Sequence, residues 1–64
     1  MKINGLGYRE LEKLGAILSE LGDKGNYKGV EFELDELTID YNPSYDCFIL
    51  SDGITEYKVD LGEI

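Results

Sequence analysis

The carboxylates of this chain are its main candidates for chemistry or binding, and they are concentrated in its second half. The 64-residue sequence holds fourteen Asp and Glu against six Lys and Arg, which gives a net charge of −8. Residues 1–29 contain five basic and four acidic side chains, whereas residues 30–64 contain one basic and ten acidic. A surface this acidic attracts basic proteins, and it repels nucleic acids and anionic membranes.

The residues needed for most catalytic chemistry are missing. With no His, the chain lacks the usual general base near neutral pH and cannot form a Ser-His or Cys-His pair. Cys47 lies in an apolar run, where a thiol is normally buried and inert. A carboxylate pair would need a deep pocket, for which so short a chain has little room. We therefore expect a protein that is not an enzyme and that uses no cofactor.

A dedicated metal site is also unexpected. One Cys and no His cannot supply the ligands of a zinc site. The segment 35–40 does not match the spacing of a calcium-binding EF-hand loop. The acidic residues are therefore better explained by protein binding or by solubility than by metal coordination.

Spacing suggests that the carboxylates form an ordered surface. On a strand, Glu31, Glu33 and Asp35 would project from one face about 6.8 Å apart, which is twice the rise per residue. Like charges directly across a sheet are destabilising, so an acidic face is a candidate for function, although acidity also gives solubility. Tyrosine is enriched in interface hot spots and can serve as an anchor. The predicted partner-binding residues are Glu31, Glu33, Asp35, Glu36, Asp40, Tyr41, Tyr45, Asp46, Asp52 and Glu56.

One amphipathic helix is predicted over residues 6–21. Apolar residues recur there at steps of three and four, at Leu11, Leu14, Ile17, Leu18 and Leu21. Asn4 is a plausible N-cap, and Gly22 is placed to end the helix in a left-handed conformation. Gly15 in the helix interior is expected to allow close packing of the helix on a sheet.

From Val30 the apolar residues alternate with a period of two, which predicts strands. The phase reverses after Glu36, and this favours a hairpin with Asp35-Glu36 at its tip and Glu31 opposite Asp40. A single long strand with a bulge is the alternative.

The last third of the chain predicts two more strands. Residues 45–50 and 54–61 read as strands separated by the turn signal Asp52-Gly53, and a two-residue turn would pair Phe48 with Tyr57. The prediction is a single α+β domain over residues 1–64, with one N-terminal helix packed on a four-stranded antiparallel β-meander (α-β-β-β-β).

A lone thiol and the lack of a long apolar run favour a cytoplasmic protein that does not enter membranes. So small a core is marginal, so a homodimer is possible. Cys47 and Ile49 are predicted on the outer face of the sheet. A structural or assembly module that self-associates through this sheet is therefore the alternative function.

In its short length, strong acidity and low cysteine content, the chain resembles small acidic proteins with which bacteriophages block host defences, including anti-CRISPR proteins and other DNA mimics. The strand-rich acidic stretch Glu31–Asp60 carries the likeness, which covers about half of the chain and is compositional. No motif defines that class, so no functional residue is transferred. The resemblance implies an inhibitor that occupies the basic surface of a nucleic-acid-binding host protein, such as a CRISPR effector or other defence nuclease, in the host cytoplasm.

Overall fold

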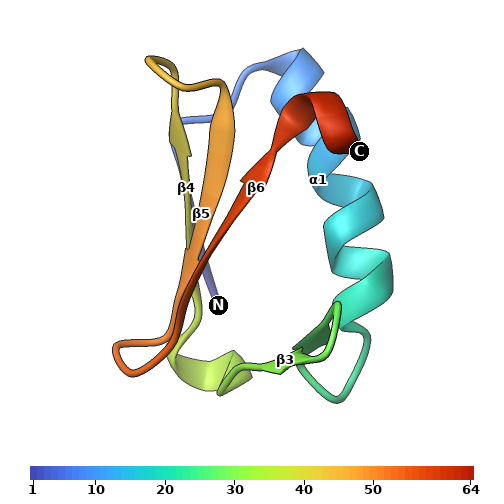
Figure 1. The fold of residues 1–64 in the computed structure, drawn as a ribbon, viewed down its shortest axis with the longest axis vertical. Coiled ribbons are helices and arrows are strands. Elements are labelled where there is room, and N and C mark those ends of the chain that lie inside the picture. Colours follow the sequence, from blue (N-terminus) through green and yellow to red (C-terminus); the bar gives the residue numbers. More distant parts are fainter.

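The computed structural model describes all 64 residues as a four-stranded sheet with one α-helix against one of its faces (Figure 1). The sheet contains β1 (Lys2–Asn4), β4 (Thr38–Asn42), β5 (Cys47–Ser51) and β6 (Glu56–Asp60), and the helix is α1 (Tyr8–Leu21). A separate hairpin pairs β2 (Asn26–Tyr27) with β3 (Val30–Glu31), and there are two 3-10 turns, η1 (Leu34–Glu36) and η2 (Leu61–Glu63). No helix has the length and apolar character needed to cross a membrane.

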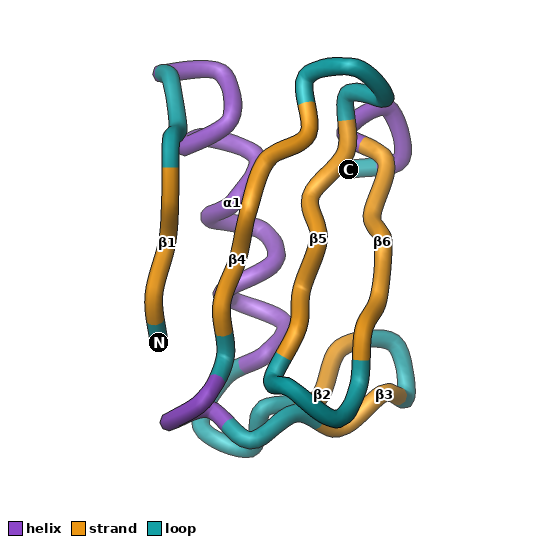
Figure 2. The backbone as a smooth tube through the Cα atoms, turned by 90° about the vertical axis from the view of Figure 1, so that its left-hand side faces the viewer, coloured by secondary structure: helices purple, strands orange, loops and turns teal.

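The sheet is mixed, with the strand order β1-β4-β5-β6 (Figure 2). β1 runs parallel to β4, and the other two pairings are antiparallel. The α+β class is confirmed, but the purely antiparallel meander is wrong, because a strand precedes the helix. With only three residues, β1 is too short to show a period of two in the sequence. Its parallel pairing requires a long crossover, and residues 5–37 supply it.

Residues 30–36 do not form a strand of this sheet, so the predicted hairpin is wrong. Val30 and Glu31 pair with β2, and the N–H of Phe32 then donates to the carbonyl of Gly25 at 2.8 Å. Phe32 is buried, and Val30 and Leu34 pack against the core. The apolar residues alternate because one side of this extended segment packs against the core. Such packing does not require the segment to pair with β4. Glu31 is paired with Asn26 and not with Asp40.

Helix α1 begins slightly later than predicted and ends where expected. Its N-cap is Gly7, whose N–H donates to Oε1 of Glu10 at 3.0 Å, so the assignment of Asn4 as N-cap is wrong. Asn4 lies in β1, where its side-chain amide donates to Asp40 Oδ1 at 2.8 Å. At the other end, Gly22 has a φ of 54° and its N–H donates to the carbonyl of Leu18. The stop at Gly22 is confirmed, but its ψ of −146° places it outside the predicted left-handed helical conformation.

The core lies between α1 and the strands β4, β5 and β6. Leu14, Ile17 and Leu21 form the buried stripe of α1. They belong to one cluster with sheet residues and with residues that close its ends: Ile39, Phe48, Leu50, Val59, Tyr27, Phe32, Leu37 and Leu61. Most of the stability of so small a domain must come from this cluster, because burial of apolar area is the dominant favourable term in folding.

The register of β5 and β6 differs from the predicted one by two residues. Phe48 pairs with Val59, and Leu50 pairs with Tyr57. The connection is longer than a two-residue turn, since Ser51 pairs with Glu56 and the N–H of Asp52 donates to the carbonyl of Thr55. A shift of two residues leaves every side chain on its predicted face.

Gly15 is not explained by packing of the helix on the sheet. It is exposed, and a Cβ atom built on it meets no atom within 4 Å. We expect Gly15→Ala to stabilise the dilute protein by about 1 kcal/mol through helix propensity alone. In a domain of this size, thermal unfolding should shift upward by about 4–8 °C.

Gly25→Ala is the matched control for this prediction. Gly25 has a φ of 69°, and a Cβ atom there would lie 2.4 Å from the carbonyl oxygen of Phe32. This variant should be destabilised, because both the backbone conformation and the space are available only to glycine. Equal melting temperatures for the two variants would contradict both assignments.

Candidate protein-binding surface

Five exposed carboxylates gather at the end of the molecule where α1 finishes. Four lie on the β3–η1 segment, and the fifth lies in the loop directly after α1 (Figure 1). We call this surface the acidic end; it consists of Asp23, Glu31, Glu33, Asp35 and Glu36. Sequence reasoning missed Asp23, because only the folded chain brings the loop after the helix to the segment that begins at β3.

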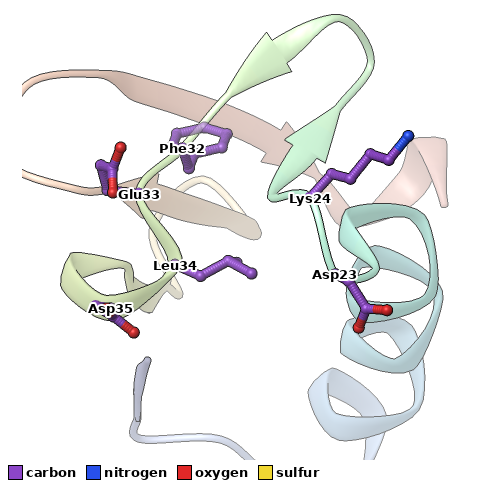
Figure 3. Close-up of a pocket in the computed structure, with 6 residues that line it drawn as sticks. All are labelled: Asp23, Lys24, Phe32, Glu33, Leu34 and Asp35. Carbon is purple, nitrogen blue, oxygen red and sulfur yellow. The ribbon is translucent and has the colours of Figure 1, made fainter.

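A hollow of about 260 Å³ lies within the acidic end. Asp23, Glu33 and Asp35 line it together with Lys24, Phe32 and Leu34 (Figure 3). Figure 3 shows Leu34 pointing from η1 toward the loop after α1, and Lys24 extending away from the carboxylates. The hollow is therefore an open depression whose lining is mostly charged, with Phe32 and Leu34 as its apolar residues. No group of three acidic or thiol side chains in the protein is arranged to hold a metal ion.

No basic side chain forms an ion pair with the acidic end, although Lys24 lines its hollow. The only ion pairs within 4.0 Å involve Arg9, which pairs with Glu10 and Asp46. Lys13 donates to the carbonyl of Ile64, and the ammonium group of Lys28 lies 5.7 Å from the ring centroid of Tyr27. The negative charge of the acidic end is thus available to an external partner.

Asp52, a predicted contact residue, has a structural role instead. Its side chain is 9% exposed, and its carboxylate accepts hydrogen bonds from the backbone N–H groups of Glu33, Ile54 and Thr55 at 2.7–3.0 Å. Hydrogen bonds from Thr55, Glu33 and Ile54 lower the pKa of Asp52 below its ordinary value. Asp52 therefore positions the acidic end by fixing Glu33, and contributes little surface of its own.

The carboxylate of Asp46 is likewise held by other residues of the protein, near the start of α1. Both of its carboxylate oxygens accept hydrogen bonds from the guanidinium of Arg9, at 2.8 and 2.7 Å. The hydroxyl of Tyr41 donates to the same carboxylate at 2.6 Å. The bond to Arg9 lowers the pKa of Asp46, and the bond to Asp46 raises the pKa of both Arg9 and Tyr41. This cluster ties the first turn of α1 to the β4–β5 turn.

The outer face of the sheet carries mixed charge. Asp40 pairs with Ile49, and Ile49 with Lys58, so an apolar and a basic residue follow the acidic one across the strands. Glu56 is exposed at the start of β6. Tyr45 is 76% exposed in the β4–β5 turn, at the end of β4 opposite to the acidic end (Figure 1). The predicted contact residues therefore divide among three places, and only those from Glu31 to Glu36 lie together.

Cys47 is not available on the outer face. It is 3% exposed, and Ile49 is only partly exposed. The outer face therefore offers less apolar surface for self-association than the alternation of residues suggested.

A scan against protein-family models and searches of curated proteins and of solved structures found no match to this chain.

We expect Asp52→Asn to loosen the acidic end without unfolding the core. Ile54 and Thr55 donate to Oδ1 and Glu33 donates to Oδ2. The amide keeps one acceptor oxygen, which can still receive the N–H groups of Ile54 and Thr55, but its NH₂ group replaces the oxygen that accepts from Glu33, so the N–H of Glu33 loses its acceptor. Hydrogen exchange measured by NMR should show roughly tenfold faster exchange at the amide of Glu33, with the amides of the turn and of the core changed less. Asp40→Asn is the control, because Asp40 is exposed and bonded only by Asn4.

Acid should weaken the fold through Asp46 and Asp52. Their pKa values are lowered on folding from an ordinary value of 3.8, so their contribution is full above that value and is lost as pH falls below it. Urea unfolding between about pH 2.5 and 7 should therefore show a smaller loss of stability in acid for the Asp46→Asn/Asp52→Asn double variant than for the natural protein. Parallel curves would contradict this assignment.

Proposed function

We propose that this protein is a non-catalytic inhibitor whose acidic end binds the basic surface of a nucleic-acid-binding protein. The observation that carries the proposal is that all five carboxylates of the acidic end are exposed and none has an ion-pair partner. Arg and Lys side chains that hold nucleic-acid phosphates are the groups that such carboxylates would occupy.

Local order at the acidic end supports tight binding. Leu34–Glu36 form a 3-10 turn, Phe32 is buried, and the N–H of Glu33 is held by Asp52. A surface already ordered before binding loses less conformational entropy on association. Most of the Coulomb attraction is then retained as affinity, and unscreened charge of one sign also accelerates encounter.

The partner class follows from this charge and from the resemblance to small acidic phage proteins. A CRISPR effector or other defence nuclease presents the long basic groove that a nucleic acid occupies. Bound there, the acidic end would exclude the substrate by repulsion and by bulk. Asp40 and Glu56 on the sheet would extend the contact, whereas Tyr45 lies at the opposite end of the sheet and is not placed to anchor it.

Charge neutralisation at the acidic end tests the proposal. The triple variant Glu33→Gln/Asp35→Asn/Glu36→Gln should bind its partner at least about tenfold more weakly, because each lost charge contact contributes on the order of 0.5–1 kcal/mol. The probes are purified CRISPR effectors and DNA nucleases, and the measurement is protection of their DNA binding in a fluorescence-anisotropy competition assay.

The matched control changes the net charge equally but elsewhere. Glu12, Asp60 and Glu63 are exposed, and no ion pair or side-chain hydrogen bond holds them. The triple variant Glu12→Gln/Asp60→Asn/Glu63→Gln should retain most of the affinity. Binding that is insensitive to salt, or equally weakened in both variants, would contradict a specific role for the acidic end.

A further inference from the structure

The side of α1 that faces the β1 edge of the sheet carries no acidic residue. Successive helix residues are about 100° apart, so Leu11 and Lys13 lie on opposite sides of α1. Lys13 reaches the C-terminal carbonyl of Ile64, which follows β6 and η2, so Leu11 faces the β1 side (Figure 2). The helix residues on the β1 side are all uncharged: Tyr8, Leu11, Gly15, Leu18 and Ser19. We call these residues, with Ile3 of β1, the uncharged flank.

Large apolar side chains are exposed on the uncharged flank. Tyr8 is 93% exposed, Leu11 is 50% exposed and Ile3 is 40% exposed. Ile3 pairs with the fully buried Ile39, so its side chain points to the helix side of the sheet. Three of the six exposed large apolar residues of the protein therefore belong to one side of the molecule. Such clustering marks interaction sites more than single exposed residues do.

Gly15 keeps the middle of this flank free of side-chain bulk. It weakens the helix, and no neighbour within the protein requires its small size. A glycine in the middle of a helix allows another backbone to approach closely. On the uncharged flank, that approach can come only from outside the chain.

β1 also offers free backbone groups. The N–H of Lys2 donates to the carbonyl of Leu37, and residues of a strand alternate in the side to which their backbone groups point. Lys2 and Asn4 therefore face β4, and the N–H and C=O of Ile3 face the open edge. The other edge of the sheet, β6, is protected by Glu56, Lys58 and Asp60.

We propose that a second copy of this chain covers the uncharged flank. The two β1 strands pair antiparallel about a two-fold axis at Ile3, each Ile3 donating its N–H to the other's carbonyl. The two α1 helices then lie antiparallel on the same face of the joined sheet, with their uncharged sides facing each other. Two molecules of net charge −8 repel, and this flank is where they meet without opposing carboxylates. The inference does not depend on the proposed inhibitory function.

A specific dimer requires an interface of a minimum size. A small specific interface takes about 600 Å² from each partner. The accessible surface of the chain is 4194 Å², so the contact would use about one-seventh of it. One side of a molecule measuring 25 × 20 × 17 Å can supply this area only if the strand edge and the helix flank both contribute. The proposed geometry uses both.

Sedimentation equilibrium of the whole chain, from micromolar to millimolar concentration, tests the dimer. The natural protein should approach twice its mass of 7.2 kDa. Gly15→Glu should weaken the dimer by roughly tenfold or more, because it places like charges at the two-fold contact. Ala16→Glu is the control: Ala16 is exposed on the adjoining, outward side of the helix, and the net charge changes equally. Circular dichroism checks that both variants stay helical.

Two results would overturn the proposal. One is a natural protein that stays monomeric over the whole range, and the other is an equal effect of Gly15→Glu and Ala16→Glu. Hydrogen exchange then locates the strand contact: the amide of Ile3 should be protected at high concentration and should exchange faster on dilution. A dimer in which the Ile3 amide exchanges equally fast at both concentrations would show that another surface is used, and would refute the edge pairing.

Discussion

The carboxylate of Asp52 is the constraint on which the arrangement of the chain after the helix depends. It accepts hydrogen bonds from its own turn, at Ile54 and Thr55, and from Glu33. One nearly buried charge thereby holds the β5–β6 connection against the segment that leads into β4. Charge-assisted hydrogen bonds of this kind are about twice as strong as neutral ones. With Glu33 fixed at the end of the sheet, the segment before it cannot also run beside β4, and β1 takes that place.

Much of this fold could be predicted from local signals, but its order in space could not. The helix, its stop at Gly22 and the strands that became β5 and β6 were predictable, because periodicity and turn residues are local properties. The alternation of Val30, Phe32 and Leu34 was misleading, since any extended segment resting on a core shows it. β1 left no signal because its three residues gain their structure from pairing with β4. The residues of the strand alone therefore do not predict such long-range pairing.

The candidate site shows the same limit for individual side chains. Asp35, Asp46 and Asp52 are the same residue type in the same acidic half of the sequence. Asp46 is held by Arg9, which is 37 residues away, and Asp52 binds Glu33, which is 19 residues away. Asp35 has neither kind of partner and remains exposed. Composition predicted an acidic surface, but only tertiary contacts separate the carboxylates that build the protein from those free to bind.

The two proposals are compatible because charge is distributed so unevenly over the molecule. The acidic end lies where α1 finishes, whereas the uncharged flank runs along the sides of α1 and β1 (Figures 1 and 2). In a dimer paired antiparallel through β1, the two acidic ends point in opposite directions, so their repulsion is small at physiological ionic strength. Each end then remains open to a basic partner. A dimer built in this way would present two separate sites, and a partner with repeated basic surfaces would be held more tightly than by a single copy.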